Sequence, residues 1–170
     1  MTPRFRLARD GDRPAIAALQ AASWASAYAP YMDPDAIAAL PQHFSDKWKD
    51  HAANPGDLVA VAEAGAAVVA VAAFLHADPM YLDNLHVRPD LKGQQIGRRL
   101  LAFCSGHLIA RGVRRAELTV IEDNQIARQF YDRMGGRVIA RERDDVMGTP
   151  VDVLRIRWDD VALWHRLASA

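Results

Sequence analysis

The sequence predicts an α/β fold in which helices flank a mixed sheet of about six to seven strands. The strongest support is a βαβ pattern, because apolar segments at 81–87 and 116–121 are separated by one helical segment and should form parallel neighbouring strands. The other apolar segments lie close together in pairs, as the strands of antiparallel hairpins do. The 170 residues include 51% hydrophobic side chains, enough for one sizeable core. We therefore predict a single domain over residues 1–170.

The first part of the chain predicts one strand followed by helices. Residues 5–7 alternate between apolar and polar as in a strand, and the helix after them has Pro14 in its first turn. One stripe of this helix contains Ile16, Leu19 and Ser23. A short second helix begins at Pro34, and residues 45–48 predict a third helical stretch.

Four further segments predict two hairpins. Residues 58–63 and 67–76 flank a turn at 64–66, although their many alanines leave helix as a competing interpretation. Residues 137–143 and 151–158 predict a second antiparallel pair, which a terminal amphipathic helix follows.

A polar loop follows the strand predicted at 81–87. The loop KGQQIG, Lys92 to Gly97, leads into a helix that Gly112 can end in a left-handed conformation. The apolar positions of the helix recur at three- and four-residue steps and are Ile96, Leu100, Phe103, Cys104 and Leu108. The free N–H groups and the dipole at a helix N-terminus favour a phosphate group. The loop matches neither the dinucleotide-binding fingerprint nor the P-loop.

This loop resembles the acyl-CoA pyrophosphate loop of the GNAT superfamily of N-acetyltransferases. The family pattern is Arg or Gln, two residues, Gly, one residue, and then Gly or Ala. Lys92 takes the first position here, Gln95 stands where the first glycine is usual, and Gly97 matches the last position. The strand before the loop and the helix and strand after it stand in the same order as in that family.

A second segment, Asn124 to Val138, is similar to the Asn-x-x-Ala-x-x-Phe-Tyr-x-x-x-Gly-Phe helix of the same family. Asp123 or Asn124 can cap this helix. One face should be buried and carries Ile126, Phe130 and Met134. The neighbouring face can direct a phenol toward a ligand and carries Asn124, Ala127 and Tyr131. Arg137 follows Gly136, so the usual aromatic residue of the family is missing.

The resemblance implies the GNAT fold, with its splayed parallel strand pair, and acetyl-CoA as cosubstrate. In that family the pantetheine arm lies between the splayed strands and bonds to backbone groups, here those of Leu85 and Val87. The N–H groups from Lys92 to Arg98 would hold the pyrophosphate. The residues expected to contact the cosubstrate are Leu85, His86, Val87, Lys92, Gly93, Gln95, Ile96, Gly97, Arg98, Asn124 and Tyr131. Gln95 should keep a negative, helical φ, because a left-handed φ is strained outside glycine.

The resemblance also implies how the acetyl group would be transferred. The N–H of Leu85 would stabilise the oxyanion, and Tyr131 stands where the family often has its general acid. We expect Asp83 to be the general base, with His86, Glu122 and a chain of water molecules as alternatives. By strand alternation Asp83 and His86 lie on opposite faces, so at most one of them faces the site.

The N-terminal helices should build the acceptor site, because they cover the sheet opposite the cosubstrate in this architecture. Trp24, Tyr28 and Tyr31 are expected there, since aromatic faces suit the cation of an amine. Trp24 and Tyr28 can equally anchor the helix to the sheet. Cys104 lies on an apolar stripe, which favours direct attack in a ternary complex over an acyl-cysteine.

The predicted function is therefore transfer of the acetyl group of acetyl-CoA to a primary amine of a small molecule, a peptide or a protein. The alternative is a non-catalytic acyl-CoA-binding sensor or regulatory domain.

Charge and composition narrow the range of partners. The 21 basic and 21 acidic residues argue against a nucleic-acid or membrane partner. Positive charge gathers around the loop and its helix, at Arg88, Lys92, Arg98, Arg99, Arg114 and Arg115. The single cysteine excludes an internal disulfide, and the six histidines show no metal-ligand spacing with it, so we expect no metal. Without a targeting segment we expect a cytoplasmic protein, as a monomer or a homodimer.

Overall fold

The computed structural model describes residues 2–49 and 54–168 of the chain. Within these residues seven strands form one sheet, in the order β1-β2-β3-β4-β5-β7-β6. β4 and β5 run parallel, and all other neighbours are antiparallel. The strands are β1 Arg4–Leu7, β2 Leu58–Ala64, β3 Ala67–Leu75, β4 Met80–Val87, β5 Ala116–Ile121, β6 Arg137–Val146 and β7 Thr149–Trp158. The predicted α/β fold and its βαβ unit are confirmed.

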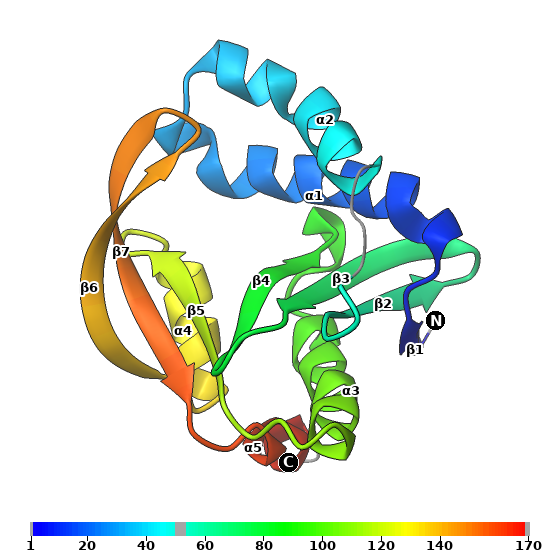
Figure 1. Ribbon diagram of the computed structural model, residues 1–170. Helices are drawn as coiled ribbons and strands as arrows, with labels where there is room; N and C mark the ends of the chain where they lie inside the picture. The colour runs from blue at the N-terminus through cyan, green and yellow to red at the C-terminus, as the bar shows by residue number, and fades with distance from the viewer. Residues whose placement is uncertain (1, 50–53, 169–170) are drawn as a thin grey trace.

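Helices cover both faces of the sheet (Figure 1). One face packs against α1 (Arg13–Tyr28) and α2 (Pro34–Lys49). The other face packs against α3 (Ile96–Ala110), α4 (Gln125–Arg133) and α5 (Ala162–Ala168). Each face has its own apolar core, so the sheet separates two hydrophobic clusters. In the described part of the chain, no helix has both the length and the apolar character needed to span a membrane.

α2 is one continuous helix, whereas the sequence predicts two separate helical stretches here. Leu40, Phe44 and Trp48 recur at four-residue steps and are almost fully buried against α1 and the sheet. Pro41 lies inside the helix and is exposed. The missing backbone donor of Pro41 is outweighed by the packing of this unbroken apolar stripe, so the prediction of two helices is wrong.

The face that α4 buries matches the prediction only in part, since Phe130 and Met134 pack on the core and Ile126 does not. Ile126 is 79% exposed, so its predicted burial is wrong. Four-residue steps turn a helix about 40° past a full turn, which leaves Ile126 about 80° away from Met134. The side that packs on the core instead carries Ala127, Phe130, Tyr131 and Met134. Asn124 caps the helix as predicted, because its Oδ1 accepts a hydrogen bond from the Ala127 N–H at 3.1 Å.

Both predicted hairpins are confirmed. Met147 and Gly148 form the two-residue turn between β6 and β7, with left-handed φ angles of 49° and 87°. Val146 and Met147, at the tip of this hairpin, pack against the core under α1 and α2. Figure 1 shows the tip reaching toward the turn that joins those two helices. The hairpin and the α1–α2 layer are therefore in contact across one end of the sheet.

β4 contains a bulge that the sequence does not predict. Asn84 pairs with Ala73 of β3 and Leu82 pairs with Phe74, so Asp83 is an extra residue without a partner. The bulge reverses the alternation of side chains. Leu82 faces the core of α3, whereas Asn84 and His86 contact α1 and Leu85 turns toward the α3 side. The strict alternation that the sequence predicts along this strand therefore fails at Asp83.

A chain of buried hydrogen bonds connects the bulge to the helical layer. The indole N–H of Trp48 donates to Gln20 Oε1 at 2.7 Å, and Gln20 Nε2 donates to Asn84 Oδ1. Asn84 Nδ2 then donates to Asp83 Oδ2 at 2.5 Å. Gln20 and Asn84 are only 1% and 4% exposed, so each needs these protein partners in place of water.

We expect Gln20→Met to lower the free energy of unfolding by about 2 kcal/mol, because it removes the acceptor of the Trp48 indole and the donor to Asn84. Urea unfolding at neutral pH measures this change. The control is Gln42→Met on α2, where the glutamine is exposed and bonds to the exposed Asp46; it should change stability by less than about 0.5 kcal/mol. Equal effects at the two positions would contradict a structural role for the buried chain.

Candidate active site

β4 and β5 pair over only two positions and then separate. Met80 pairs with Ala116 and Tyr81 with Glu117. In the described sheet, residues 82–87 of β4 have no partner on β5. Just beyond these positions the Tyr81 hydroxyl and Thr119 Oγ1 lie 2.8 Å apart and bridge the two strands. The predicted splayed parallel pair is confirmed. The backbone groups of residues 82–87 that face β5 are therefore available to a ligand.

The loop before α3 differs from the prediction at Gln95. Its φ is 61°, in the left-handed region, so the expected helical φ is wrong. Gln95 is the N-cap residue of α3, and its carbonyl accepts the N–H of Arg99 at 3.0 Å. The loop thus enters α3 through Gly93 and Gln95, both left-handed, and turning the chain this way strains the non-glycine residue by roughly 1–2 kcal/mol.

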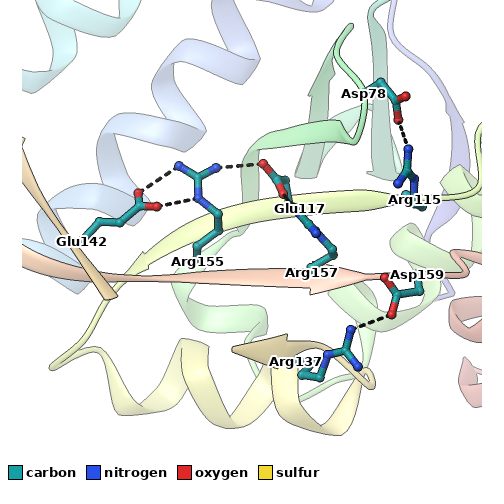
Figure 2. Close-up of polar contacts among 8 residues, drawn as sticks. All are labelled: Asp78, Arg115, Glu117, Arg137, Glu142, Arg155, Arg157 and Asp159. Carbon is teal, nitrogen blue, oxygen red and sulfur yellow. Dashed lines mark hydrogen bonds and ion pairs between the residues drawn. The ribbon is translucent and has the colours of Figure 1, made fainter. Parts of the chain in front are cut away.

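In the part of the chain that the structure describes, three of the six cations around this loop and its helix have protein partners. Arg88 pairs with Asp90 at 2.7 Å, and Arg99 lies over the Phe5 ring at 5.0 Å. Arg115 pairs with Asp78 at 2.8 Å, beyond the far end of α3 (Figure 2). Arg98 differs from these, because within the described residues its Nε atom is buried and has no hydrogen-bond partner. A buried donor in the first turn of α3 is suited to an anionic ligand at this helix N-terminus.

Tyr131 of α4 packs against two other aromatic rings. Its ring lies 5.4 Å from that of Phe130 and 5.9 Å from that of Trp158. Burial raises the pKa of Tyr131 well above its usual value, and the neighbouring phenols of Tyr28 and Tyr81 raise it further. Tyr131 is therefore a protonated phenol at neutral pH, close to the point where β4 and β5 separate.

Asp83 and His86 both face the α1–α2 layer, so the expectation that they lie on opposite faces is wrong. The bulge at Asp83 is the physical reason, since it shifts the alternation by one residue. Asp83 Oδ2 accepts from Lys47 Nζ of α2 at 3.1 Å. His86 Nδ1 lies 3.0 Å from Ser23 Oγ of α1.

His86 is a neutral imidazole at physiological pH. Burial lowers the pKa of His86 to about 4, and the positive charges of Lys92 and Lys47 contribute to the lowering. A histidine with so low a pKa binds protons weakly, which makes it a poor candidate for the general base at neutral pH.

Glu122 lies in a polar pocket at the end of β5. The pocket has a volume of about 570 Å³ and is also lined by Tyr31 and by residues of the β6–β7 hairpin. Glu122 is engaged there in an ion pair, because its Oε2 lies 2.7 Å from the Arg141 guanidinium. Of the aromatic residues expected at the acceptor site, Tyr31 is the one that lines this pocket.

Trp24 and Tyr28 pack inside the helical layer. The Trp24 ring lies 4.8 Å from Tyr28 and 5.3 Å from Phe44 of α2, both edge to face. Trp24 therefore holds α1 against α2, whereas the anchoring interpretation expects contact with the sheet. Burial raises the pKa of Tyr28, and a hydrogen bond with the Asn124 side chain partly offsets the rise. Tyr28 thus links α1 to the cap of α4.

A ladder of ion pairs, not found by sequence reasoning, lies on β5, β6 and β7 (Figure 2). Arg155 joins Glu117 and Glu142 at 2.8 Å each, and Arg157 lies 2.9 Å from Glu117. The neighbours of Glu117 on β5 face the α3 core, so the ladder lies on the opposite side of the sheet, with Tyr81 and Thr119. The polar residues at every second position were visible in the sequence, but the pairing of β5 with β7 was not.

Comparison with known proteins agrees with this geometry. A family model described as the acetyltransferase (GNAT) family matches residues 16–136. A search of curated proteins finds no match. Since the matched residues make up most of the chain, the protein belongs to the GNAT acetyltransferase family.

Solved structures share the fold over nearly the whole chain. The PaiA N-acetyltransferase of Thermoplasma acidophilum, solved in complex with coenzyme A, has a TM-score of 0.74 at 18% identity and covers 93% of this chain and 100% of its own. The ribosomal-protein-S18-alanine N-acetyltransferase of Escherichia coli has a TM-score of 0.70 at 19% identity, with 91% and 92% covered. A GCN5-related N-acetyltransferase of Rhodopseudomonas palustris has a TM-score of 0.73 at 22% identity, with 94% and 96% covered.

The protein is accordingly an N-acetyltransferase that uses acetyl-CoA and an amine acceptor. Its residues fit this cosubstrate: the N-terminus of α3 and the buried Nε of Arg98 suit a pyrophosphate, and the backbone of β4 is free to bond along its separation from β5. Among the described residues no group of three or more histidine, cysteine or acidic side chains is placed to hold a metal ion.

We expect Gln95→Gly to raise the free energy of unfolding by about 0.5–1 kcal/mol, because glycine adopts the left-handed φ without strain and this gain exceeds its extra unfolded-state entropy. Urea unfolding measures the difference. Gln94→Gly is the matched control, since Gln94 is exposed and has no left-handed φ; it should not stabilise the fold. Equal effects at both positions would show that Gln95 is unstrained.

The lowered pKa of His86 predicts a pH-dependent stability. A histidine with a folded pKa of about 4, below its ordinary 6.5, stabilises the fold above about pH 6.5, and this contribution is lost as the pH falls toward 4. Because part of the ring stays exposed, we expect the loss from about pH 7 to about pH 5 to be only about 1–2 kcal/mol.

His86→Gln should remove most of this loss, whereas His43→Gln, at an exposed position on α2, should keep the wild-type pH dependence. Urea unfolding at the two pH values checks this. An unchanged pH dependence in His86→Gln would refute the assignment.

Proposed function

We propose that the enzyme transfers the acetyl group directly to a primary amine of a small molecule, a peptide or a protein, within a ternary complex. The observation that carries this proposal is the protonated phenol of Tyr131 beside the separating strands β4 and β5. Cys104 is fully buried, and burial raises the pKa of its thiol. Such a thiol is unreactive, which supports direct transfer over an acyl-cysteine.

Acetyl-CoA supplies an activated acetyl thioester, and two parts of the chain hold it. The backbone N–H groups from Lys92 to Arg98, through Gly93, Gln95, Ile96 and Gly97, bind the pyrophosphate at the N-terminus of α3. The side chain of Arg98 adds its unpartnered Nε there. Backbone groups of Leu85, His86 and Val87 bind the pantetheine as a neighbouring strand would, and Asn124 contacts it from the cap of α4.

Three groups then act on the reacting atoms. Asp83 takes a proton from the acceptor amine; its carboxylate is 26% exposed and faces the α1–α2 layer. The N–H of Leu85 stabilises the negative charge that develops on the carbonyl oxygen. Tyr131 gives its proton to the departing sulfur. Asp83 is favoured over His86 because of the low pKa of the imidazole. It is favoured over Glu122 because Asp83 lies on β4 two residues before Leu85, whereas Glu122 follows the end of β5.

The acceptor site extends toward the polar pocket at the end of β5. Tyr31 offers an aromatic face to an amine cation there, and the pocket also has arginine and acidic side chains. Tyr28 and Trp24 pack against each other inside the layer of α1 and α2, and support this side of the pocket.

We expect Tyr131→Phe to lower kcat about tenfold or more, because the leaving sulfur loses its proton donor. The affinity for acetyl-CoA should change little. Release of free CoA thiol with a panel of diamines, amino acids and short peptides measures kcat, and calorimetry with acetyl-CoA measures Kd. Tyr31→Leu is the comparison variant: it removes the aromatic face, so it should raise KM for the acceptor and leave kcat near the wild-type value. An unchanged kcat in Tyr131→Phe would remove this phenol from the mechanism.

A further inference from the structure

The chain has three lysines, and one of them lies where an acceptor amine would bind. They are Lys47, Lys49 and Lys92. The ammonium group of Lys47 lies 3.1 Å from the carboxylate of Asp83, our proposed general base. Lys49 and Lys92 are exposed and form no ion pair within the described part of the chain. Lys47 therefore holds the same contact with Asp83 that the ammonium of an external acceptor needs.

Lys47 is also close to the part of β4 assigned to the thioester carbonyl. Asp83 precedes Leu85 by two residues, a separation of roughly 7 Å along a strand, and the four-carbon stem of a lysine can cross such a distance by rotation. The charge of Lys47 also lowers the pKa of His86, on the far side of Leu85 from Asp83. The ammonium of Lys47 thus interacts electrostatically with Asp83 and with His86, which lie on either side of Leu85 in β4.

From this placement we infer that Lys47 is an internal acceptor, which the enzyme acetylates with its own acetyl-CoA when no external amine occupies the site. The inference rests on the proposed function of Asp83 and Leu85. The side chain of Lys47 is 39% exposed and that of Asp83 is 26% exposed, so an external ammonium can displace Lys47 from the carboxylate. Self-acetylation and transfer to an external acceptor would then compete for the same carboxylate, that of Asp83.

The step balances with acetyl-CoA as the only co-reactant. The Lys47 ammonium loses a proton through Asp83 to water, and Nζ forms a bond to the carbonyl carbon of the thioester. The carbon–sulfur bond breaks and the sulfur leaves with a proton from Tyr131, which is reprotonated by the second proton that Nζ releases. The products are Nζ-acetyl-Lys47, free CoA and one proton. The acetylated side chain has no charge, so it no longer pairs with Asp83 and leaves that carboxylate to the external acceptor.

The test is incubation of the full-length protein with acetyl-CoA and no added amine, followed by peptide mass spectrometry of all three lysines. We expect Lys47 to gain one acetyl group well before Lys49 and Lys92, at a first-order rate that does not depend on protein concentration. Asp83→Asn should slow this modification about 100-fold, as loss of a general base does. Lys49→Arg should leave it unchanged. Heat-unfolded protein should show equal, slow labelling of the three lysines.

A second readout needs no transfer reaction. Acetic anhydride labels accessible lysines directly, and bound CoA should protect Lys47 from it, because the thiol end of CoA would lie beside Nζ. Lys49, two residues further along α2, should not be protected. Lack of protection at Lys47, with protection at Lys92 in the pyrophosphate loop, would show that CoA binds as proposed but does not reach Lys47, and would overturn the inference.

The outcomes separate the inference from the proposed function. If CoA is released to added amines in an Asp83-dependent manner while Lys47 stays unmodified or reacts no faster than Lys49, the inference fails and the proposed function stands. If Lys47 is acetylated selectively and Asp83→Asn has no effect, the internal acceptor stands and the role of Asp83 as base fails.

Discussion

The extra residue in β4 is the constraint on which the site depends. Without it, strict alternation would turn Asn84 toward the apolar core under α3 and Leu85 toward the polar side. With it, Leu85 and Val87 stay against the α3 core while Asp83, Asn84 and His86 reach the α1–α2 layer. One inserted position therefore gives both a continuous core and a polar lining in the same strand.

The buried amides explain why the bulge stays at this position. Gln20 and Asn84 are each enclosed, and Gln20 Nε2 donates to Asn84 Oδ1, so each amide fixes the position of the other. A shift of the bulge by one residue would leave buried donors and acceptors without partners, at about 1–3 kcal/mol for each group. An apolar pair could fill the same space but would not select one register, so the hydrogen-bonded chain adds specificity where packing alone cannot.

The regular elements could be predicted from sequence because each one has a uniform period. The strand at 116–121 alternates from Ala116 to Val120, and the structure has β5 at 116–121. β4 mixes two periods, since Met80, Leu82, Leu85 and Val87 face one core at steps of two, three and two. The three-residue step from Leu82 to Leu85 indicates the bulge. A prediction that assumes strict alternation along the strand does not detect it.

Local signals also failed where tertiary packing decides the outcome. The sequence predicts two separate helical stretches between Pro34 and Trp48, yet the buried stripe of Leu40, Phe44 and Trp48 keeps α2 continuous through Pro41. Gln95 was expected to avoid the left-handed region, yet the turn into α3 imposes it. A strained φ such as that of Gln95 persists where the surrounding structure allows no other conformation. The loop before α3 meets this condition, because it has to direct several N–H groups toward one point.

The charge state of the site at neutral pH limits which acceptors can bind. Tyr131 is protonated and His86 is neutral, so neither adds charge, and the Asp83 carboxylate already has the Lys47 ammonium as its partner. Lys47 is tethered to the same molecule, so its effective concentration at Asp83 is in the millimolar range or above. An acceptor that offers only an ammonium competes poorly against such a tethered group. Under the proposed function, productive acceptors therefore need further contacts, and we propose that the polar pocket beside Tyr31 provides them.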